Sequence, residues 1–159
     1  MCSGYSIPRK NIYSLRHFRS TMQVRYSAEE MYDLVNDIEA YPQFLPWCTA
    51  ADIVSRNENT LSARIVLAKG RIKQSFTTAN TLKRGRSIEM RLIEGPFKHL
   101  TGSWRFDPFD AQRCEVSLEM DFEFANRIIS VAFGPFFNRI LNSLIRAFQQ
   151  RAADLYGER

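Results

Sequence analysis

Cysteine is scarce in this 159-residue chain, which holds three cysteines and two histidines. Cys2, Cys48 and Cys114 form no CxxC pair and no cluster with either histidine. We therefore expect no structural zinc site and no other metal site. We expect instead that the cysteines are free thiols in a reducing compartment. Cys48 follows Trp47, and we interpret it as a small packed residue rather than a nucleophile.

Long apolar runs are missing as well. None approaches the about 20 residues that a membrane-spanning helix needs, so an integral membrane protein is not expected. Residues 1–16 lack the apolar segment of a secretory signal, and residues 1–20 lack acidic residues but contain four of the 22 lysines and arginines. We predict that residues 1–16 are a disordered basic extension and that residues 17–159 form a single domain. An organelle transit peptide is the alternative for the extension.

Residues 127–156 carry an apolar stripe with steps of three and four residues, which predicts a long amphipathic helix. Asn126 is a candidate N-cap and Gly157 a candidate stop. Gly134-Pro135 interrupts the pattern, because an interior proline clashes with the carbonyl four residues earlier. The sequence leaves two alternatives open here, a kinked helix or two successive helices.

The stretch before residue 60 predicts a strand and short helices. Residues 17–26 are the candidate first strand, and Ser27 followed by Glu30 is a capping box that predicts a helix start. Pro42 and Pro46 then stop the helix and allow one short turn in an aromatic segment, residues 41–47.

From Leu61 onward the apolar period changes to two. Apolar and polar residues alternate in five segments separated by turn signals, which predicts five half-buried strands. Their apolar positions include Leu61–Leu67, Ile72–Leu82, Ile88–Leu92, Leu100–Phe106 and Cys114–Phe124. Short connections make the neighbours antiparallel, with one dry and one wet face. The order of elements predicts an α+β fold in which the C-terminal helix lies across a curved sheet of six or seven strands.

No catalytic set follows from this pattern. His99 has outward parity, and Glu119, Asp121 and Glu123 share the wet face, where we expect a solvated row that faces Arg105 on the next strand. The dry face of the last three strands carries no Asp, Glu, His or Lys. Because acid–base catalysis needs a positioned titratable group, we predict no catalytic residue and no enzymatic activity.

Several ordered motifs resemble the coenzyme Q-binding START-like family, whose bacterial branch includes the ribosome association toxin A (RatA) proteins. They are YSAEEMYDLVNDI at 26–38, YPQFLPWC at 41–48, GPFKHL at 95–100, WRF at 104–106, DFEF at 121–124 and the closing residues 147–156. The resemblance implies the helix-grip (START-like/SRPBCC) fold, with a deep apolar tunnel between sheet and helix. It also implies two functions, binding of a polyprenyl quinone in support of respiration, or binding of the large ribosomal subunit that blocks subunit joining.

We predict an apolar cavity on the dry face, with simple filling of the core by the aromatic residues as the alternative. The candidate ligand-binding residues are Tyr41, Phe44, Phe97, Leu100, Trp104, Phe122, Phe133, Phe137 and Leu141. No cofactor is expected apart from a bound polyprenyl quinone.

A second candidate surface is basic. Residues 59–93 contain eight basic residues and one acid, Glu89, and three adjacent strands are expected to place many of them on one edge of the sheet and its turns. They are Arg64, Lys69, Arg71, Lys73, Lys83, Arg84, Arg86 and Arg91. The alternatives are a solvated face, contact with ribosomal RNA, or contact with anionic lipid headgroups at a membrane surface. DNA is not an expected partner.

From the sequence we rank hydrophobic-ligand binding first and ribosome association second, because a charge-free interior suits a polyprenyl tail. The expected location is the cytoplasm of a bacterium, at or near the inner membrane, or the matrix side of a mitochondrion.

Overall fold

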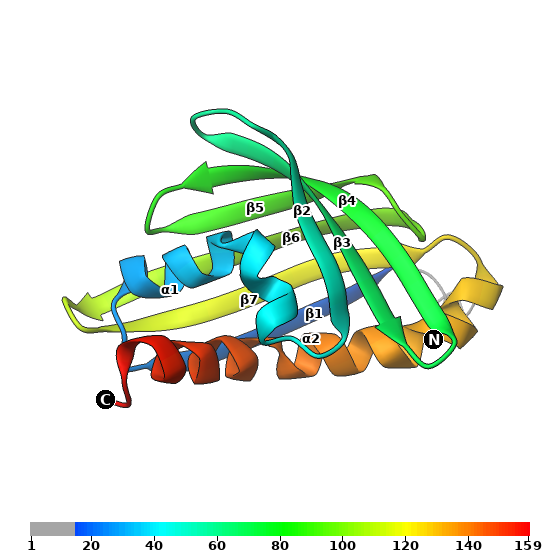
Figure 1. Cartoon of the computed structure of the whole chain (residues 1–159). Coiled ribbons are helices and arrows are strands. Elements are labelled where there is room, and N and C mark those ends of the chain that lie inside the picture. The colour runs from blue at the N-terminus through cyan, green and yellow to red at the C-terminus, as the bar shows by residue number, and fades with distance from the viewer. Residues whose placement is uncertain (1–14) are drawn as a thin grey trace, which may run out of the picture.

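The computed structural model describes residues 15–159, which fold as one curved seven-stranded sheet with helices on its concave side (Figure 1). The prediction of disorder concerned residues 1–16. Of these, only residues 15 and 16 belong to the described part of the chain. The elements are β1 (Arg16–Val24), α1 (Ala28–Asn36), the 3-10 helix η2 (Ile38–Gln43), β2 (Cys48–Arg56), β3 (Thr60–Lys69), β4 (Ile72–Lys83), β5 (Ser87–Glu94), β6 (Phe97–Asp110), β7 (Arg113–Phe124) and α2 (Arg127–Tyr156).

All strand pairs are antiparallel, in the order β1-β7-β6-β5-β4-β3-β2. β3 and β4 are neighbours in which Ile65 lies opposite Phe76, as the alternation predicts. Leu100 and Trp104 of β6 are buried on the concave side, whereas the acidic row of β7 lies on the convex side. The prediction of an α+β helix-grip fold is confirmed.

Helix α1 begins where the capping box predicts. The Glu30 backbone N–H donates to the Ser27 hydroxyl over 3.0 Å, and the Ser27 N–H donates to the Glu30 carboxylate over 2.9 Å. Two N–H groups without helical partners are satisfied in this way, which fixes where α1 starts.

The segment after α1 differs from the prediction in two ways. The short turn is the 3-10 helix η2, which contains Pro42 and ends before Phe44. Strand β2 follows, although no alternation in the sequence predicted it. β2 is an edge strand with irregular register on either side of Asp52, and Val54 is 61% exposed. An edge strand with little burial carries no clean alternation, which explains why the pattern did not reveal it.

Helix α2 is one 30-residue helix with Pro135 inside it, so the alternative of two helices is wrong. Asn126 caps its start by accepting from the Ile129 N–H over 2.9 Å, and Gly157 ends it with φ of 89°. The carbonyl four residues before Pro135 belongs to Val131, in an exposed stretch where water can replace the lost hydrogen bond. By length and composition α2 could cross a membrane, contrary to our sequence expectation, but its apolar face packs on the sheet.

Candidate functional site

An apolar cavity of about 90 Å³ lies between the concave face of the sheet, η2 and helix α2. Strands β3 to β7 contribute its floor, and α2 covers it. Its lining residues are Ile38, Tyr41, Leu45, Trp47, Ala63, Ile65, Leu67, Phe76, Thr78, Asn80, Met90, Leu100, Trp104, Leu118, Met120, Phe137, Ile140, Leu141 and Leu144. The cavity is much smaller than the about 300–1,000 Å³ of typical ligand pockets. The deep tunnel that the resemblance implies is therefore absent from this conformation of residues 15–159.

The structure separates the nine candidate ligand-binding residues into two groups. Five line the cavity: Tyr41, Leu100, Trp104, Phe137 and Leu141. The other four, Phe44, Phe97, Phe122 and Phe133, do not. Cavity and filled core, which the sequence analysis treated as alternatives, therefore both occur, in different parts of the interior.

The aromatic residues outside the cavity fill the core instead. Phe97 lies at the centre of a ring cluster, with centroids 5.2 Å from Phe137 and 5.4 Å from Phe124. Phe44 packs on Phe148 at 5.3 Å, and the Arg151 guanidinium lies 4.9 Å from its ring centroid. Period-two alternation placed Phe122 on the dry face, but it does not distinguish a residue beside a void from a residue in close packing.

Thr78 and Asn80 are polar residues in the cavity wall that the sequence analysis missed. They are 6% and 5% exposed, and the Thr78 hydroxyl donates to the Asn80 side-chain oxygen over 2.8 Å. That bond leaves the Asn80 amide nitrogen as a donor for a ligand. The signal was present in the sequence, because both residues share the parity of Phe76 and Leu82 on β4.

A tyrosine in the cavity wall and two buried cysteines are protonated at physiological pH. Burial raises the pKa of Tyr41, whose hydroxyl donates to the Val35 carbonyl oxygen. Burial also raises the pKa of the Cys48 thiol to about 11 and that of Cys114 to about 12. Because a thiolate and not a thiol is the nucleophile, neither cysteine is activated for attack.

The carboxylate row on the convex face is solvated, as predicted, but its partners differ from the prediction. Arg105 lies opposite Ser117, not opposite the acidic row. His17 of β1 bridges two carboxylates instead, at 3.3 Å from Glu119 and 2.7 Å from Asp121.

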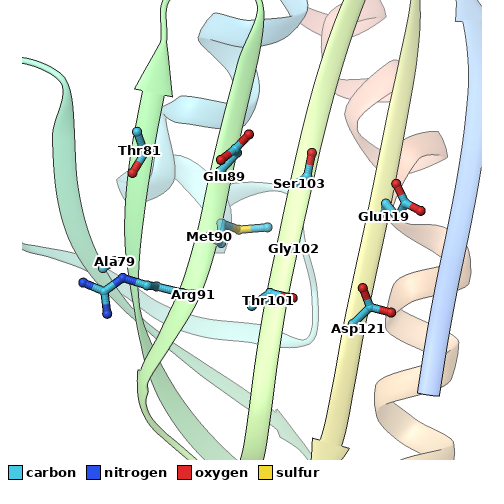
Figure 2. Close-up of a pocket in the computed structure, with 10 residues that line it drawn as sticks. All are labelled: Ala79, Thr81, Glu89, Met90, Arg91, Thr101, Gly102, Ser103, Glu119 and Asp121. Atoms are coloured by element: carbon cyan, nitrogen blue, oxygen red, sulfur yellow. The ribbon is translucent and has the colours of Figure 1, made fainter. Parts of the chain in front are cut away.

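A hollow of about 480 Å³ lies beside this row on the convex face (Figure 2). It is lined by Ala79, Thr81, Glu89, Met90, Arg91, Thr101, Gly102, Ser103, Glu119 and Asp121. Figure 2 shows the carboxylates of Glu89 and Glu119 on different strands, with Ser103 between them. None of its charged side chains is buried, so the hollow is an open surface feature.

The eight basic residues do not form one patch. Lys69 and Arg71 lie at the β3–β4 turn, with Lys73 and Arg64 nearby, and Arg91 lies on the convex face of β5. Lys83, Arg84 and Arg86 lie at the β4–β5 turn. The two turns are at opposite ends of β4, whose 12 residues span about 36 Å. The expected turns do carry most of these residues, but the two turns are separated by the length of β4, which lies inside the sheet and not at its edge.

A curved antiparallel sheet gripping a long helix over an apolar cavity defines the START-like class of proteins. Residues 24–149 match the family described as polyketide cyclase/dehydrase and lipid transport, and the chain belongs to this family. The resemblance on which the sequence analysis relied is confirmed.

Among the relatives, the Ribosome association toxin RatA of Escherichia coli K12 is 42% identical over 139 residues, which are 87% of this chain and 88% of that protein. The mitochondrial coenzyme Q-binding protein COQ10 homolog B of Xenopus laevis is 26% identical over 136 residues, which are 83% of this chain and 56% of that protein. Among solved structures, the Zhui aromatase/cyclase of Streptomyces sp. R1128 superimposes with a TM-score of 0.74 at 20% identity, over 91% of this chain and 99% of that one.

Proposed function

We propose that this protein associates with the ribosome, binding the large subunit and blocking subunit joining. The observation that carries the proposal is the 42% identity to a ribosome association toxin over nearly the full length of both chains. The proposal reverses the order favoured by the sequence alone, because the coenzyme Q-binding relative is the more distant one and the cavity is small. It requires a compartment that holds ribosomes, the bacterial cytoplasm or the mitochondrial matrix.

The β3–β4 end of the sheet is the surface we propose for ribosomal RNA. Lys69, Arg71 and Lys73 lie there, with Arg64 opposite Thr77 further along β3, and none of the four forms an ion pair within the described part of the chain. Unpaired cations on an exposed turn are available to RNA phosphates, and each contact releases a counterion.

Sedimentation with purified large subunits tests this proposal at two salt concentrations. Binding should weaken steeply as salt rises, and the triple variant Lys69→Glu/Arg71→Glu/Lys73→Glu should lose it. The matched control is Lys83→Glu/Arg84→Glu/Arg86→Glu, which changes the net charge equally at the opposite end of β4. Equal loss in both variants would reject this end as the RNA surface, and absence of sedimentation by the unmodified protein would reject ribosome association.

The second candidate function is binding of a hydrophobic small molecule in the cavity, and the Asn80 amide is the observation that favours it. Apolar walls with one oriented donor suit a ligand that is largely hydrocarbon and carries a carbonyl, as a quinone ring does. A polyprenyl quinone exceeds a 90 Å³ space, which corresponds to about three waters at about 30 Å³ each, so uptake requires side chains of the wall to move.

Organic extraction of the purified protein followed by mass spectrometry tests the second function. The cavity-filling variant Ala63→Leu serves as the matched sample, because Ala63 lines the cavity and is 2% exposed. Isoprenoid quinone in the unmodified sample and its loss from Ala63→Leu would support ligand binding. If protein purified in the presence of its native membranes yields an extract without isoprenoid quinone, that result would count against ligand binding.

We further propose that neither function is enzymatic. Tyr41 is the one titratable residue in the cavity lining, whose other members are apolar apart from Thr78 and Asn80, and its raised pKa keeps it protonated. General acid–base catalysis needs a group that exchanges protons near the working pH. The likeness to an aromatase/cyclase at 20% identity concerns the fold alone. Assays for cyclisation of a polyketide substrate should therefore detect no turnover.

A further inference from the structure

A second hollow, of about 600 Å³, lies on the outer side of the cavity, where the loop before β2 meets the end of β3 and helix α2. We call it the outer groove. It is lined by Pro46, Trp47, Ala68, Lys69, Phe136, Arg139, Ile140 and Ser143. Most of these side chains are apolar, so the outer groove offers a hydrocarbon-compatible surface that is open to solvent.

Trp47 and Ile140 line both the outer groove and the inner cavity. They are therefore the partition between the two spaces. The backbone of Trp47 is held in place, because the Ala68 N–H donates to its carbonyl oxygen over 2.9 Å. Its side chain is half-buried, so the indole is the part of this partition that can rotate without moving a helix or a strand.

The charge of the outer groove is one-sided. Lys69 and Arg139 are its charged lining residues, and no carboxylate lines it. Within residues 15–159 neither cation has an ion-pair partner. A neutral ligand leaves both cations unused, whereas a carboxylate gains charge-assisted hydrogen bonds from both while its chain covers the apolar wall.

We propose that the outer groove and the cavity together bind an anionic single-chain amphiphile of the fatty-acid type. Its carboxylate lies between Lys69 and Arg139, its chain lies along Phe136 and Pro46, and the end of the chain passes Trp47 and Ile140 into the cavity. This proposal rests on the second candidate function, ligand binding in the cavity, and names the class of ligand, but it places the polar group of the ligand at Lys69 and Arg139 of the outer groove rather than at the Asn80 amide. It assigns the polar end to the surface and only the last few carbons to the 90 Å³ space.

Calorimetric titration with dodecanoate, below its micelle concentration, tests the proposal against the uncharged methyl dodecanoate of equal chain length. The variant Lys69→Gln/Arg139→Gln should weaken dodecanoate binding by about tenfold or more and leave methyl dodecanoate binding nearly unchanged. The control Lys83→Gln/Arg86→Gln, at the other end of β4, should bind both ligands as the unmodified protein does. Ala63→Leu should weaken both ligands, because it fills the cavity.

Three results would overturn the proposal. One is dodecanoate binding that survives Lys69→Gln/Arg139→Gln. Another is binding to phosphatidylglycerol vesicles without uptake of monomeric dodecanoate, which would make the outer groove a bilayer contact. The third is uptake of a decyl-substituted benzoquinone without uptake of dodecanoate, which would reject the anionic ligand and preserve the cavity function. Failure of all these ligands would reject both proposals, with circular dichroism showing that each variant is folded.

Discussion

The Thr78 hydroxyl donates a 2.8 Å hydrogen bond to the side-chain oxygen of Asn80, and both residues lie in the wall of an otherwise apolar cavity. Thr78→Val removes the donor and leaves the buried Asn80 amide oxygen unsatisfied, which should cost about 1–3 kcal/mol of unfolding free energy. The double variant Thr78→Val/Asn80→Leu removes both partners and should cost less than the two single changes added together. Urea denaturation of the four proteins gives this coupling, and strictly additive losses would contradict it.

Gly102 makes room for two methionines at the floor of the cavity. A Cβ added there would lie 2.8 Å from the Met90 Cε and 3.3 Å from the Met120 Cγ. In Gly102→Ala the flexible Met90 side chain should move toward the cavity, because thioethers adapt at low cost. We expect a loss of unfolding free energy of about 1 kcal/mol or less and weaker uptake of methyl dodecanoate.

Truncation of Met90 is the control for this prediction. Gly102→Ala/Met90→Ala should restore uptake of the ester, since the displaced side chain is then absent. Unaltered uptake by Gly102→Ala alone would show that Met90 does not move into the cavity.

Cys48 should be inert toward alkylation in the folded protein. With a pKa of about 11, its thiolate fraction at pH 8 is about one in a thousand, against about one in four for an ordinary thiol near 8.5. Cys114, with a pKa of about 12, should be slower still. Iodoacetamide labelling followed by mass spectrometry should modify both in urea and neither in buffer, in a Cys2→Ser background. Rapid native labelling of Cys48 would contradict its burial.

Glu30 should contribute stability at neutral pH that disappears in acid. Although burial raises the pKa of this carboxyl, the Ser27 N–H and the Arg159 guanidinium, 2.9 Å away, together hold it below its ordinary 4.5. A lowered folded-state pKa gives stability that is present above 4.5 and lost as pH falls through the folded value. Glu30→Gln keeps an acceptor for the Ser27 N–H but loses the charge, and should cost about 0.5–1 kcal/mol at pH 7.

The pH dependence is the readout for this prediction. Denaturation midpoints of Glu30→Gln and the unmodified protein should converge as pH falls from 5 to 3. Arg159→Gln should show a loss similar to that of Glu30→Gln at pH 7, and a constant gap at every pH would exclude the ion pair as its cause.

Local patterns in the sequence predicted most of the fold. The Ser27–Glu30 capping box marked the start of α1, and the alternation from Leu61 to Phe124 gave five strands whose antiparallel pairing the structure confirms. Period and capping are properties of neighbouring residues, so they can be read without knowing the rest of the chain. Strand β2 was not predicted, because an edge strand buries few side chains and therefore shows no clear alternation.

The candidate site was predictable only in part. Parity assigned Leu100, Trp104 and Phe122 to the dry face, yet only the first two line the cavity. Whether a buried side chain borders a void depends on how α2 settles on the sheet, and that depends on many side-chain volumes at once. Thr78 and Asn80 were on the predicted face, but nothing local distinguishes a polar residue in a cavity wall from one in a frayed strand.

The sequence by itself determined the α+β architecture, the start of α1, both ends of α2 and the apolar, acid-free interior, because each depends on residues close together in the chain. Only the tertiary structure decided the size of the cavity, the separation of Lys69 from Lys83 by the length of β4, and the meeting of Lys69 with Arg139 at one groove. Those last two residues are far apart in sequence and come together because α2 lies across the end of β3. Distances of this kind are set by packing between elements and not by the pattern within any one of them.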